Sequence, residues 1–232
     1  MSLFYIADLH LSTGDPGKRM DVFGGRWRGY TDKIIKGWRD CVRDGDTVVI
    51  GGDLSWGMTL RQAYTDLLLI NGLPGEKILL EGNHDFYWQS VKKMTEFCAE
   101  NDLRFSFLRN NAYRVGDVAV CGTRGWYTDE REVAETNADS VVMIPREAQR
   151  LRASLEAGAA LGGEPVVFMH FPPVFGAYRC DEFADVMLSY GVRRCYFGHI
   201  HGKYSVPPRI NYRGIDFYYG AGDYLDFRPL LV

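Results

Sequence analysis

The side chains best suited to chemistry stand together in one short stretch, where Asn83, His84 and Asp85 follow one another directly. The apolar run 77–80 precedes them and is typical of a short buried strand, while Gly82 permits a sharp turn in between. The three side chains offer an oxygen ligand for a cation, a proton donor near neutral pH and an acceptor to orient that donor. The stretch therefore predicts a site that combines metal binding with proton transfer.

All the histidines of the chain follow expected strands in the same way. They are His10, His84, His170, His199 and His201. Asp8 and Asp53 also end expected strands, and Asp8 lies two residues from His10, so that both project to one side of an extended chain. The carboxyl ends of strands line the ligand crevice of an α/β sheet, so we expect these side chains to meet. Mixed imidazole and carboxylate ligands suit zinc, iron or manganese, and their number predicts two divalent transition-metal ions.

The composition is that of an ordinary globular protein, with 46% hydrophobic and 25% charged residues. The length of 232 residues suits one α/β domain that covers residues 1–232. A net charge of −3 argues against a broad nucleic-acid-binding surface, so we do not expect nucleic acid as a partner.

The cysteines and the apolar segments indicate where the protein resides. The five cysteines are odd in number, far apart and without a Cys-x-x-Cys motif, which predicts reduced thiols and no thiolate zinc site. The sequence has no basic segment followed by a long apolar one, and no apolar run of membrane-spanning length. We therefore expect a cytoplasmic protein with no signal peptide and no membrane partner.

Strands and helices alternate along most of the chain and must position these residues. The expected strands cover 3–7, 46–50, 77–80, 165–169 and 194–197. The expected helices cover 30–43, 59–71, 88–100, 144–157 and 181–190. Residues 104–122 are different, because short apolar runs surround a hairpin turn at Gly116 and Asp117, which predicts antiparallel pairing in that part.

Two irregular segments are expected near the site. Residues 12–30 are rich in Gly and Arg and predict a loop beside it, and residues 123–142 predict a loop or lid. Arg124 and Arg179 are candidates for binding a substrate phosphate, because a guanidinium group matches phosphate oxygens in a bidentate geometry. Ion pairing with the acidic stretch 129–132 is an equal alternative.

Several aromatic residues are candidates for stacking on a nucleobase or an aromatic leaving group. They are Trp56, Trp126, Tyr127 and Tyr178. Aromatic side chains near a cleft serve packing at least as often, so this alternative also stays open.

Taken in order, the motifs resemble the five sequence blocks of the calcineurin-like metallophosphoesterase superfamily. The blocks are Asp8-x-His10, Gly52-Asp53, Gly82-Asn83-His84-Asp85, His170 and Gly198-His199-x-His201. Any one block is uninformative, whereas the ordered set across residues 8–201 is specific. Residues 20–24 and 122–126 also resemble a bacterial branch of predicted cytosolic phosphohydrolases.

The resemblance implies a four-layer α/β/β/α sandwich of two mixed β-sheets, with two metal ions at the strand ends. By motif position the implied ligands are Asp8, His10 and His201 for one metal, Asn83, His170 and His199 for the other, and Asp53 as the bridge. The family's pattern places His84 at the scissile group and not on a metal, and it gives Asp85 the supporting position beside this histidine.

The resemblance also implies a reaction. A water between the two metals would lose its proton near neutral pH and attack the phosphorus, while His84 would protonate the departing oxygen. A small phosphorylated substrate, either a phosphomonoester or a phosphodiester, is expected. Two alternatives stay open: a metal-binding scaffold of the same fold that binds other proteins, and a nuclease. Scaffolds in the superfamily characteristically lose the histidine found here at position 84, and nucleases usually carry added domains.

Overall fold

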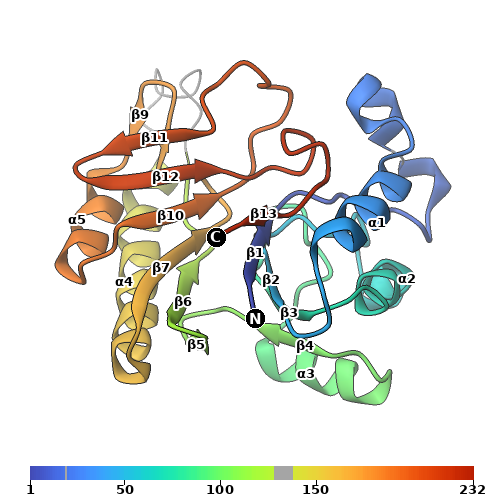
Figure 1. Ribbon diagram of the computed structural model, residues 1–232, viewed down its shortest axis with the longest axis horizontal. Helices are drawn as coiled ribbons and strands as arrows, with labels where there is room; N and C mark the ends of the chain where they lie inside the picture. The colour runs from blue at the N-terminus through green and yellow to red at the C-terminus, as the bar shows by residue number, and fades with distance from the viewer. Residues whose placement is uncertain (19, 128–137) are drawn as a thin grey trace.

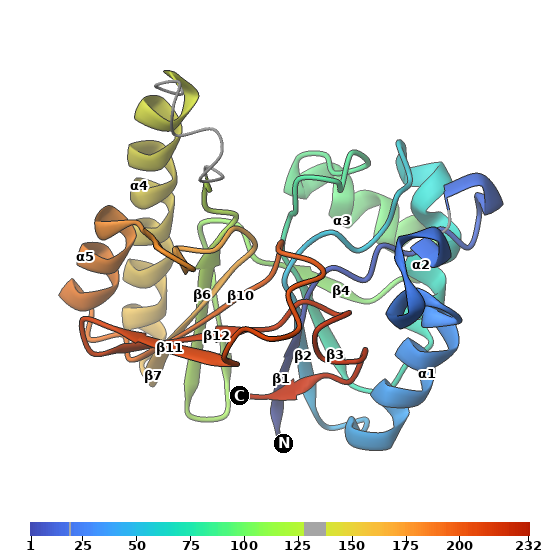
Figure 2. The ribbon, with the colours of Figure 1, turned by 90° about the horizontal axis from the view of Figure 1, so that it is seen from above.

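A computed structural model of the chain describes residues 1–18, 20–127 and 138–232. Two β-sheets pack face to face, and helices cover the outer face of each (Figures 1 and 2). The helices are α1 (Tyr30–Cys41), α2 (Leu60–Asn71), α3 (Val91–Glu100), α4 (Ala138–Leu161) and α5 (Asp181–Ser189). The first three helices lie on one sheet, and α4 and α5 lie on the other (Figure 2). This arrangement confirms the expected four-layer sandwich of two mixed sheets.

The first sheet has five strands in the order β13-β1-β2-β3-β4. Their bounds are β1 (Leu3–Ile6), β2 (Thr47–Ile50), β3 (Glu76–Leu79), β4 (Phe105–Phe107) and β13 (Leu230–Leu231). Strands β1 to β4 run parallel and β13 pairs antiparallel with β1. The carboxyl ends of β1, β2 and β3 therefore lie at one edge of the sheet, and the polar residues that follow these strands must meet there.

The second sheet has six strands in the order β11-β12-β10-β7-β6-β5. Their bounds are β5 (Ala112–Val115), β6 (Val118–Thr123), β7 (Glu164–Met169), β10 (Arg194–Phe197), β11 (Arg209–Tyr212) and β12 (Ile215–Tyr219). The four central strands are parallel, and the edge strands β5 and β11 are antiparallel to their neighbours. A small hairpin of β8 (Val174–Phe175) and β9 (Tyr178–Arg179) follows β7.

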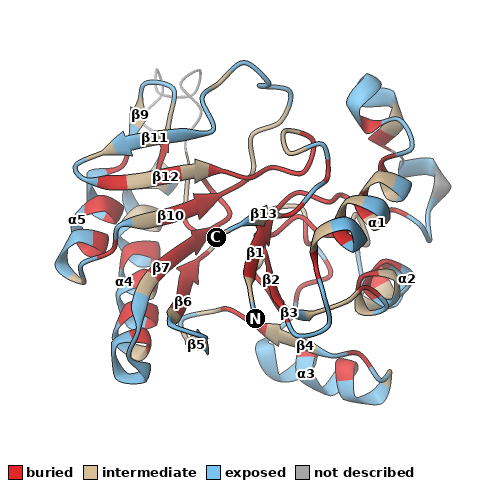
Figure 3. Ribbon diagram, viewed as in Figure 1, coloured by how far each residue is buried: buried red, intermediate tan, exposed pale blue. Residues whose placement is uncertain are grey.

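Successive side chains of each central strand point to opposite faces of the sheet, which explains how both faces become buried. In β1, Phe4 and Ile6 point to the helices of the first sheet, whereas Tyr5 points to the second sheet. Between the sheets, Tyr5 lies 5.6 Å from Phe168, ring centre to ring centre, and donates its hydroxyl to the carbonyl of Met169. Figure 3 shows the buried residues concentrated in these strands. The two sheets thus hold their carboxyl ends in a fixed relation.

Two expectations about local structure were wrong. Strand β4 pairs parallel with β3, because α3 intervenes between them and a strand–helix–strand crossover returns the chain in the same direction; only β5 and β6 form the expected antiparallel pair. Helix α4 begins at Ala138, so residues 138–142 are helical and not irregular. Val141 and Val142 are exposed there, so this turn has no periodic apolar face to reveal it. Thr123, at the other end of the expected lid, belongs to β6, and residues 128–137 lie outside the described residues.

Helix α3 starts at Val91 because the side chain of Ser90 accepts a hydrogen bond from the backbone N–H of Lys93 and caps the helix.

Within the described part of the chain, no helix is both long enough and apolar enough to cross a membrane.

Candidate metal centre

The candidate residues leave their strands through an unusual backbone conformation. Asp8, His10, Asp53 and His199 all have positive φ angles, between 44° and 72°. Non-glycine residues rarely adopt this left-handed region, which costs on the order of 1–3 kcal/mol per residue and persists only where the surroundings enforce it. Four such residues at the ends of β1, β2 and β10 turn their side chains toward one place.

Two glycines let the turns after β2 and β3 approach each other closely. A Cβ atom on Gly52 would lie 2.7 Å from Cα of Gly82 and 2.8 Å from Nδ1 of His170. A Cβ atom on Gly82 would overlap the backbone nitrogen and Oδ1 of Asp53. The contact between these turns is possible only without side chains at both positions.

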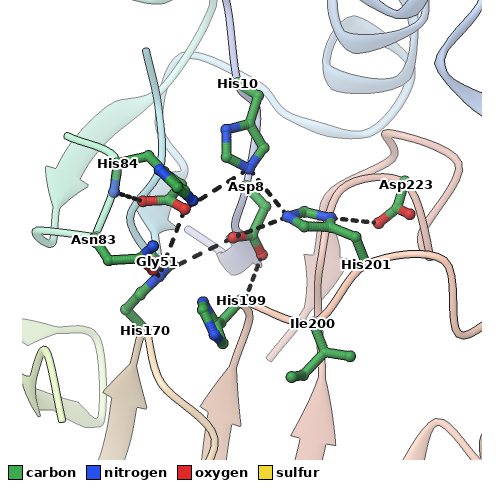
Figure 4. Close-up of polar contacts among 12 residues, drawn as sticks. Asp8, His10, Gly51, Asn83, His84, His170, His199, Ile200, His201 and Asp223 are labelled. Carbon is green, nitrogen blue, oxygen red and sulfur yellow. Dashed lines mark hydrogen bonds and ion pairs between the residues drawn. The ribbon is translucent and has the colours of Figure 1, made fainter. Parts of the chain in front are cut away.

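The first group of ligand atoms comes from Asp8, His10 and His201, which lie within 4.8 Å of one another. Nε2 of His10 faces Nε2 of His201 at 3.0 Å, and Nε2 of His201 lies 3.7 Å from Oδ1 of Asp8. Figure 4 shows these side chains converging from the ends of β1 and β10. Their nitrogen and oxygen atoms surround a common point, as ligands of one ion do.

The second group comes from Asp53, His170 and His199, whose ligand atoms also lie within 4.8 Å of one another. Asn83 joins it, because Oδ1 of Asn83 lies 2.6 Å from Nε2 of His170. Oδ2 of Asp53 lies 3.6 Å from Nε2 of His170 and 3.7 Å from Nε2 of His10, which belongs to the first group. The carboxylate of Asp53 therefore adjoins both groups, as a bridging ligand would.

Burial makes these groups suitable for cations. Asp8 and Asp53 are buried, and burial raises the pKa of both carboxyl groups. Oδ1 of Asp8 and Oδ2 of Asp53 have no hydrogen-bond partner among the described residues. Burial also lowers the pKa of His170 to about 3, which keeps this imidazole neutral and able to ligate. Buried acceptors without donors, beside neutral imidazoles, fit a pair of divalent transition-metal ions.

The second nitrogen of two histidines is fixed by its own partner. Nδ1 of His170 lies 3.0 Å from the carbonyl oxygen of Gly51, and Nδ1 of His201 lies 3.1 Å from Oδ1 of Asp223. These partners favour the tautomer that leaves Nε2 free to ligate. Asp223 also accepts hydrogen bonds from the backbone N–H of Gly202 and the hydroxyl of Tyr204, both at 3.0 Å. Asp223 is not among the residues expected from the sequence, although it follows β12 as the other candidates follow their strands.

Asp85 connects the turns after β2 and β3. Its buried carboxylate accepts hydrogen bonds from the backbone N–H groups of Gly82 and Asp53, both at 2.8 Å, and of Leu54 at 2.9 Å. Burial raises the pKa of Asp85 to about 7, and the charge of Asp53 acts in the same direction. No hydrogen bond within the described residues joins this carboxylate to the imidazole of His84. The catalytic assignment of Asp85 stays a prediction.

His84 stands beside the ligand groups and belongs to neither. Its backbone N–H donates to Oδ1 of Asp53 at 2.7 Å, which fixes the residue against the bridging carboxylate. The imidazole centre lies 5.7 Å from that of His10, 4.6 Å from Trp56 and 6.0 Å from Phe86. The ring nitrogens of His84 make no hydrogen bond with the part of the chain that the structure describes. This placement suits a proton donor that faces a substrate.

The three substrate candidates lie in different surroundings. Arg124 pairs with Glu81 at 3.8 Å and lies over the ring of Phe171 at 5.5 Å. After burial, the charge of Arg124 is a further cause of the lowered pKa of His170, so this cation lies near the second group. Trp126 packs on Phe171 at 5.9 Å and donates its indole N–H to Ser140.

Arg179 is not brought to the ligand groups by any described contact. Its guanidinium donates to the carbonyl oxygens of Gly176 and Tyr178 in its own hairpin and lies 5.4 Å from the ring of Tyr212. The acidic stretch 129–132, the alternative partner of both arginines, lies outside the described residues.

Comparison with solved structures supports the fold. The chain resembles a protein of unknown function from Aquifex aeolicus (15% identity, TM-score 0.51, covering 99% of this chain and 95% of that one). It also resembles a phosphopantetheinyl hydrolase from Mycobacterium tuberculosis (16% identity, TM-score 0.53, covering 100% and 95%). A putative 5′-nucleotidase from Staphylococcus aureus is similar as well (15% identity, TM-score 0.50, covering 94% of this chain but 48% of that one).

A search among curated proteins found no match to the sequence. The family comparison is decisive, because residues 1–203 match the calcineurin-like phosphoesterases across nearly the whole chain and include every candidate ligand. The chain therefore belongs to the calcineurin-like phosphoesterase family.

Proposed function

We propose that this protein is a dinuclear metal-dependent phosphohydrolase that acts on a small phosphomonoester or phosphodiester. The observation that carries the proposal is the pair of ligand groups that adjoin at Asp53, with His84 beside them and outside both. A single structural metal would not need a second ligand group, and a non-catalytic site would not need an uncommitted imidazole at its margin.

The ligands explain the preference for a phosphoryl group. Asp8, His10 and His201 would hold one metal, Asn83, His170 and His199 would hold the other, and Asp53, which adjoins both groups, would be shared between them. Mn, Fe or Zn suits this mixture of imidazole and carboxylate. Two divalent ions, when bound, supply Lewis acidity and an activated water nucleophile. Because two carboxylates cancel only part of that positive charge, the centre attracts an anionic phosphoryl group.

The remaining residues act on the substrate directly. His84, when protonated, donates its proton to the departing oxygen, which lowers the cost of expelling an alkoxide. Asp53 holds the backbone of His84 through a 2.7 Å hydrogen bond, so the bridging ligand and the proton donor keep a constant relation. Arg124, held by Glu81, contributes positive charge on the side of the second group. Trp126 and Arg179 remain candidates for contacts farther from the phosphorus.

The proposal is tested by reconstituting the purified protein with Mn, Fe or Zn and measuring metal content and hydrolysis together. The substrate panel contains phosphomonoesters, phosphodiesters and nucleotides. We expect about two metals per chain and metal-dependent hydrolysis of at least one substrate class.

Asp46→Asn is a suitable control for substitutions in the centre, because Asp46 is also a buried carboxylate with two backbone partners. It should retain both metals and full activity. A stoichiometry that never exceeds one would contradict the dinuclear centre. Two bound metals without hydrolysis of any ester would favour the scaffold, and salt-sensitive retention of DNA or RNA in a gel shift would favour a nuclease.

A further inference from the structure

We propose that Trp56 and Phe86 form a leaving-group subsite, and that the natural substrate carries an aromatic ring on the departing oxygen. This inference rests on the proposed function, because it takes the proton transfer from His84 as its starting point. The group attached to the departing oxygen must lie next to the residue that protonates that oxygen. The surroundings of the His84 imidazole therefore indicate what kind of group is expelled.

Three rings surround the imidazole of His84. One is His10, which belongs to the first ligand group and lies on the side where the phosphoryl group binds. The other two are Trp56, at 4.6 Å and an interplanar angle of 47°, and Phe86, at 6.0 Å and 73°. A substituent that leaves the metal centre past His84 thus meets an indole and a phenyl ring.

Trp56 is held rigidly at the border between the metal centre and this subsite. Its ring stacks on His10 with a centre distance of 4.9 Å and an interplanar angle of 24°. Its backbone N–H donates to the carbonyl of Leu11 at 2.9 Å, and its carbonyl accepts from the Lys18 ammonium at 3.2 Å. The stacking and the two backbone hydrogen bonds therefore fix the indole beside His10 and His84.

Phe86 is exposed where packing alone would not place it. Half of its side chain, 50%, is accessible to solvent, although the neighbouring residues Asp85 and Tyr87 are buried. Its backbone N–H donates to the carbonyl of His84 at 2.9 Å, which fixes the backbone of Phe86 relative to the proposed proton donor. The half-exposed phenyl ring thus offers apolar surface beside His84 that a ring of the leaving group can cover.

Charge divides the surroundings of the centre into two parts. Arg124 lies over Phe171 and pairs with Glu81, which also pairs with Arg109 at 3.4 Å. Within the described residues, no cation lies over the ring of Trp56 or Phe86. The anionic part of a substrate is thus favoured near Arg124, and the faces of Trp56 and Phe86 carry no cation that a substrate ring would have to displace.

The test compares two phosphate esters whose leaving groups are both primary alkoxides: ethyl phosphate and 2-phenylethyl phosphate. Because both alkoxides are poor leaving groups, a difference in kcat/KM reports the ring and not the need for a proton. We expect the metal-loaded wild type to prefer the phenylethyl ester, and Phe86→Ala to lose roughly 3- to 10-fold in kcat/KM on that ester beyond any loss on ethyl phosphate. Phe86→Tyr, which keeps the ring, should retain the preference.

Leu68→Ala is the matched control, since Leu68 is an exposed leucine (46% accessible) on α2 with no place in the site. Trp56→Ala also removes packing from His10, so its metal content is measured before its kinetics are interpreted. A wild type with equal kcat/KM on both esters would overturn the subsite and leave the proposed function intact. A Phe86→Ala variant whose kcat/KM falls equally on both esters would do the same. A metal-loaded wild type that hydrolyses neither ester but does hydrolyse another ester of the substrate panel would overturn the subsite alone, whereas one that hydrolyses no ester of the panel would overturn both proposals.

Discussion

Replacing Gly82 by alanine is expected to displace Asp53 and damage both halves of the metal centre. The added Cβ atom would overlap Oδ1 and the backbone nitrogen of Asp53 and would lie 2.8 Å from its Cγ. Asp53 has little room to retreat, because its backbone N–H and that of Gly82 both donate to the same oxygen of Asp85, each at 2.8 Å. Separating the two turns therefore weakens this shared hydrogen bonding as well.

The expected cost follows from these contacts. Introducing a carbon atom into a closely packed site typically costs about 1–3 kcal/mol. The overlap involves backbone as well as side-chain atoms, so we expect the upper half of that range, about 2–3 kcal/mol. For a protein of this length the midpoint of thermal unfolding falls by about 2–4 °C per kcal/mol, which gives a decrease of roughly 4–12 °C.

The assay combines thermal unfolding, followed by circular dichroism on metal-free protein, with the metal content of the reconstituted protein. Gly45→Ala is the control, because a Cβ atom there would meet no atom within 4 Å. Its effect on stability is expected to stay within about 0.5 kcal/mol. If Gly82→Ala unfolded at the wild-type temperature and bound both metals, the turns after β2 and β3 could not be as close as described, and the reasoning would fail.

Three other substitutions separate the roles of individual residues. Asp53→Asn is expected to impair both metal sites because the bridging charge is lost, whereas His10→Ala should weaken mainly one site. Elemental analysis of equally folded variants measures this difference. Full retention of both metals in Asp53→Asn would remove the bridging assignment. His84→Ala should keep its metals and lose activity by roughly 10²–10⁴-fold. The loss should be larger on alkyl than on nitrophenyl esters, because an alkoxide needs the proton more. Equal losses in steady-state kinetics on the two kinds of ester would reject the proton-donor role. Asp223→Ala should weaken metal binding by roughly 10- to 100-fold, because His201 loses its orienting partner. A metal titration that matches the wild type would show that this partner is dispensable.

The sequence was sufficient to predict which residues form the two candidate ligand groups, because the signals for them are local. Asp8, His10, Asp53 and His170 each follow a short apolar run, and parallel strands necessarily bring such ends to one edge. The spacing of His199 and His201 after an apolar run gives the same signal. The two groups found in the structure contain these residues without exception, and Asn83 adjoins one of them.

Other features depend on contacts between distant segments and leave no local signal. Asp223 reaches His201 only because β12 lies beside β10. The sequence places Asp85 directly after His84 and suggested that it supports the imidazole. Its carboxylate instead accepts hydrogen bonds from the backbone of a turn about thirty residues earlier. The exposure of Phe86, beside buried residues in the same turn, also depends on tertiary packing. No periodicity in the sequence distinguishes these cases from ordinary acidic or aromatic residues.

The metal centre combines features that each disfavour the folded chain in the absence of cations. Four of its residues adopt left-handed backbone conformations, Asp8 and Asp53 are buried with unpaired oxygens, and the Nε2 atoms of His10 and His201 lie 3.0 Å apart. The two sheets, with cores on both sides of each, supply the packing that holds these residues in place. The gathering of these unfavourable features around one set of side chains fits a functional site that the rest of the fold maintains. His84, the proposed proton donor, and Trp56 and Phe86, the proposed aromatic subsite, lie beside the same candidate ligand groups.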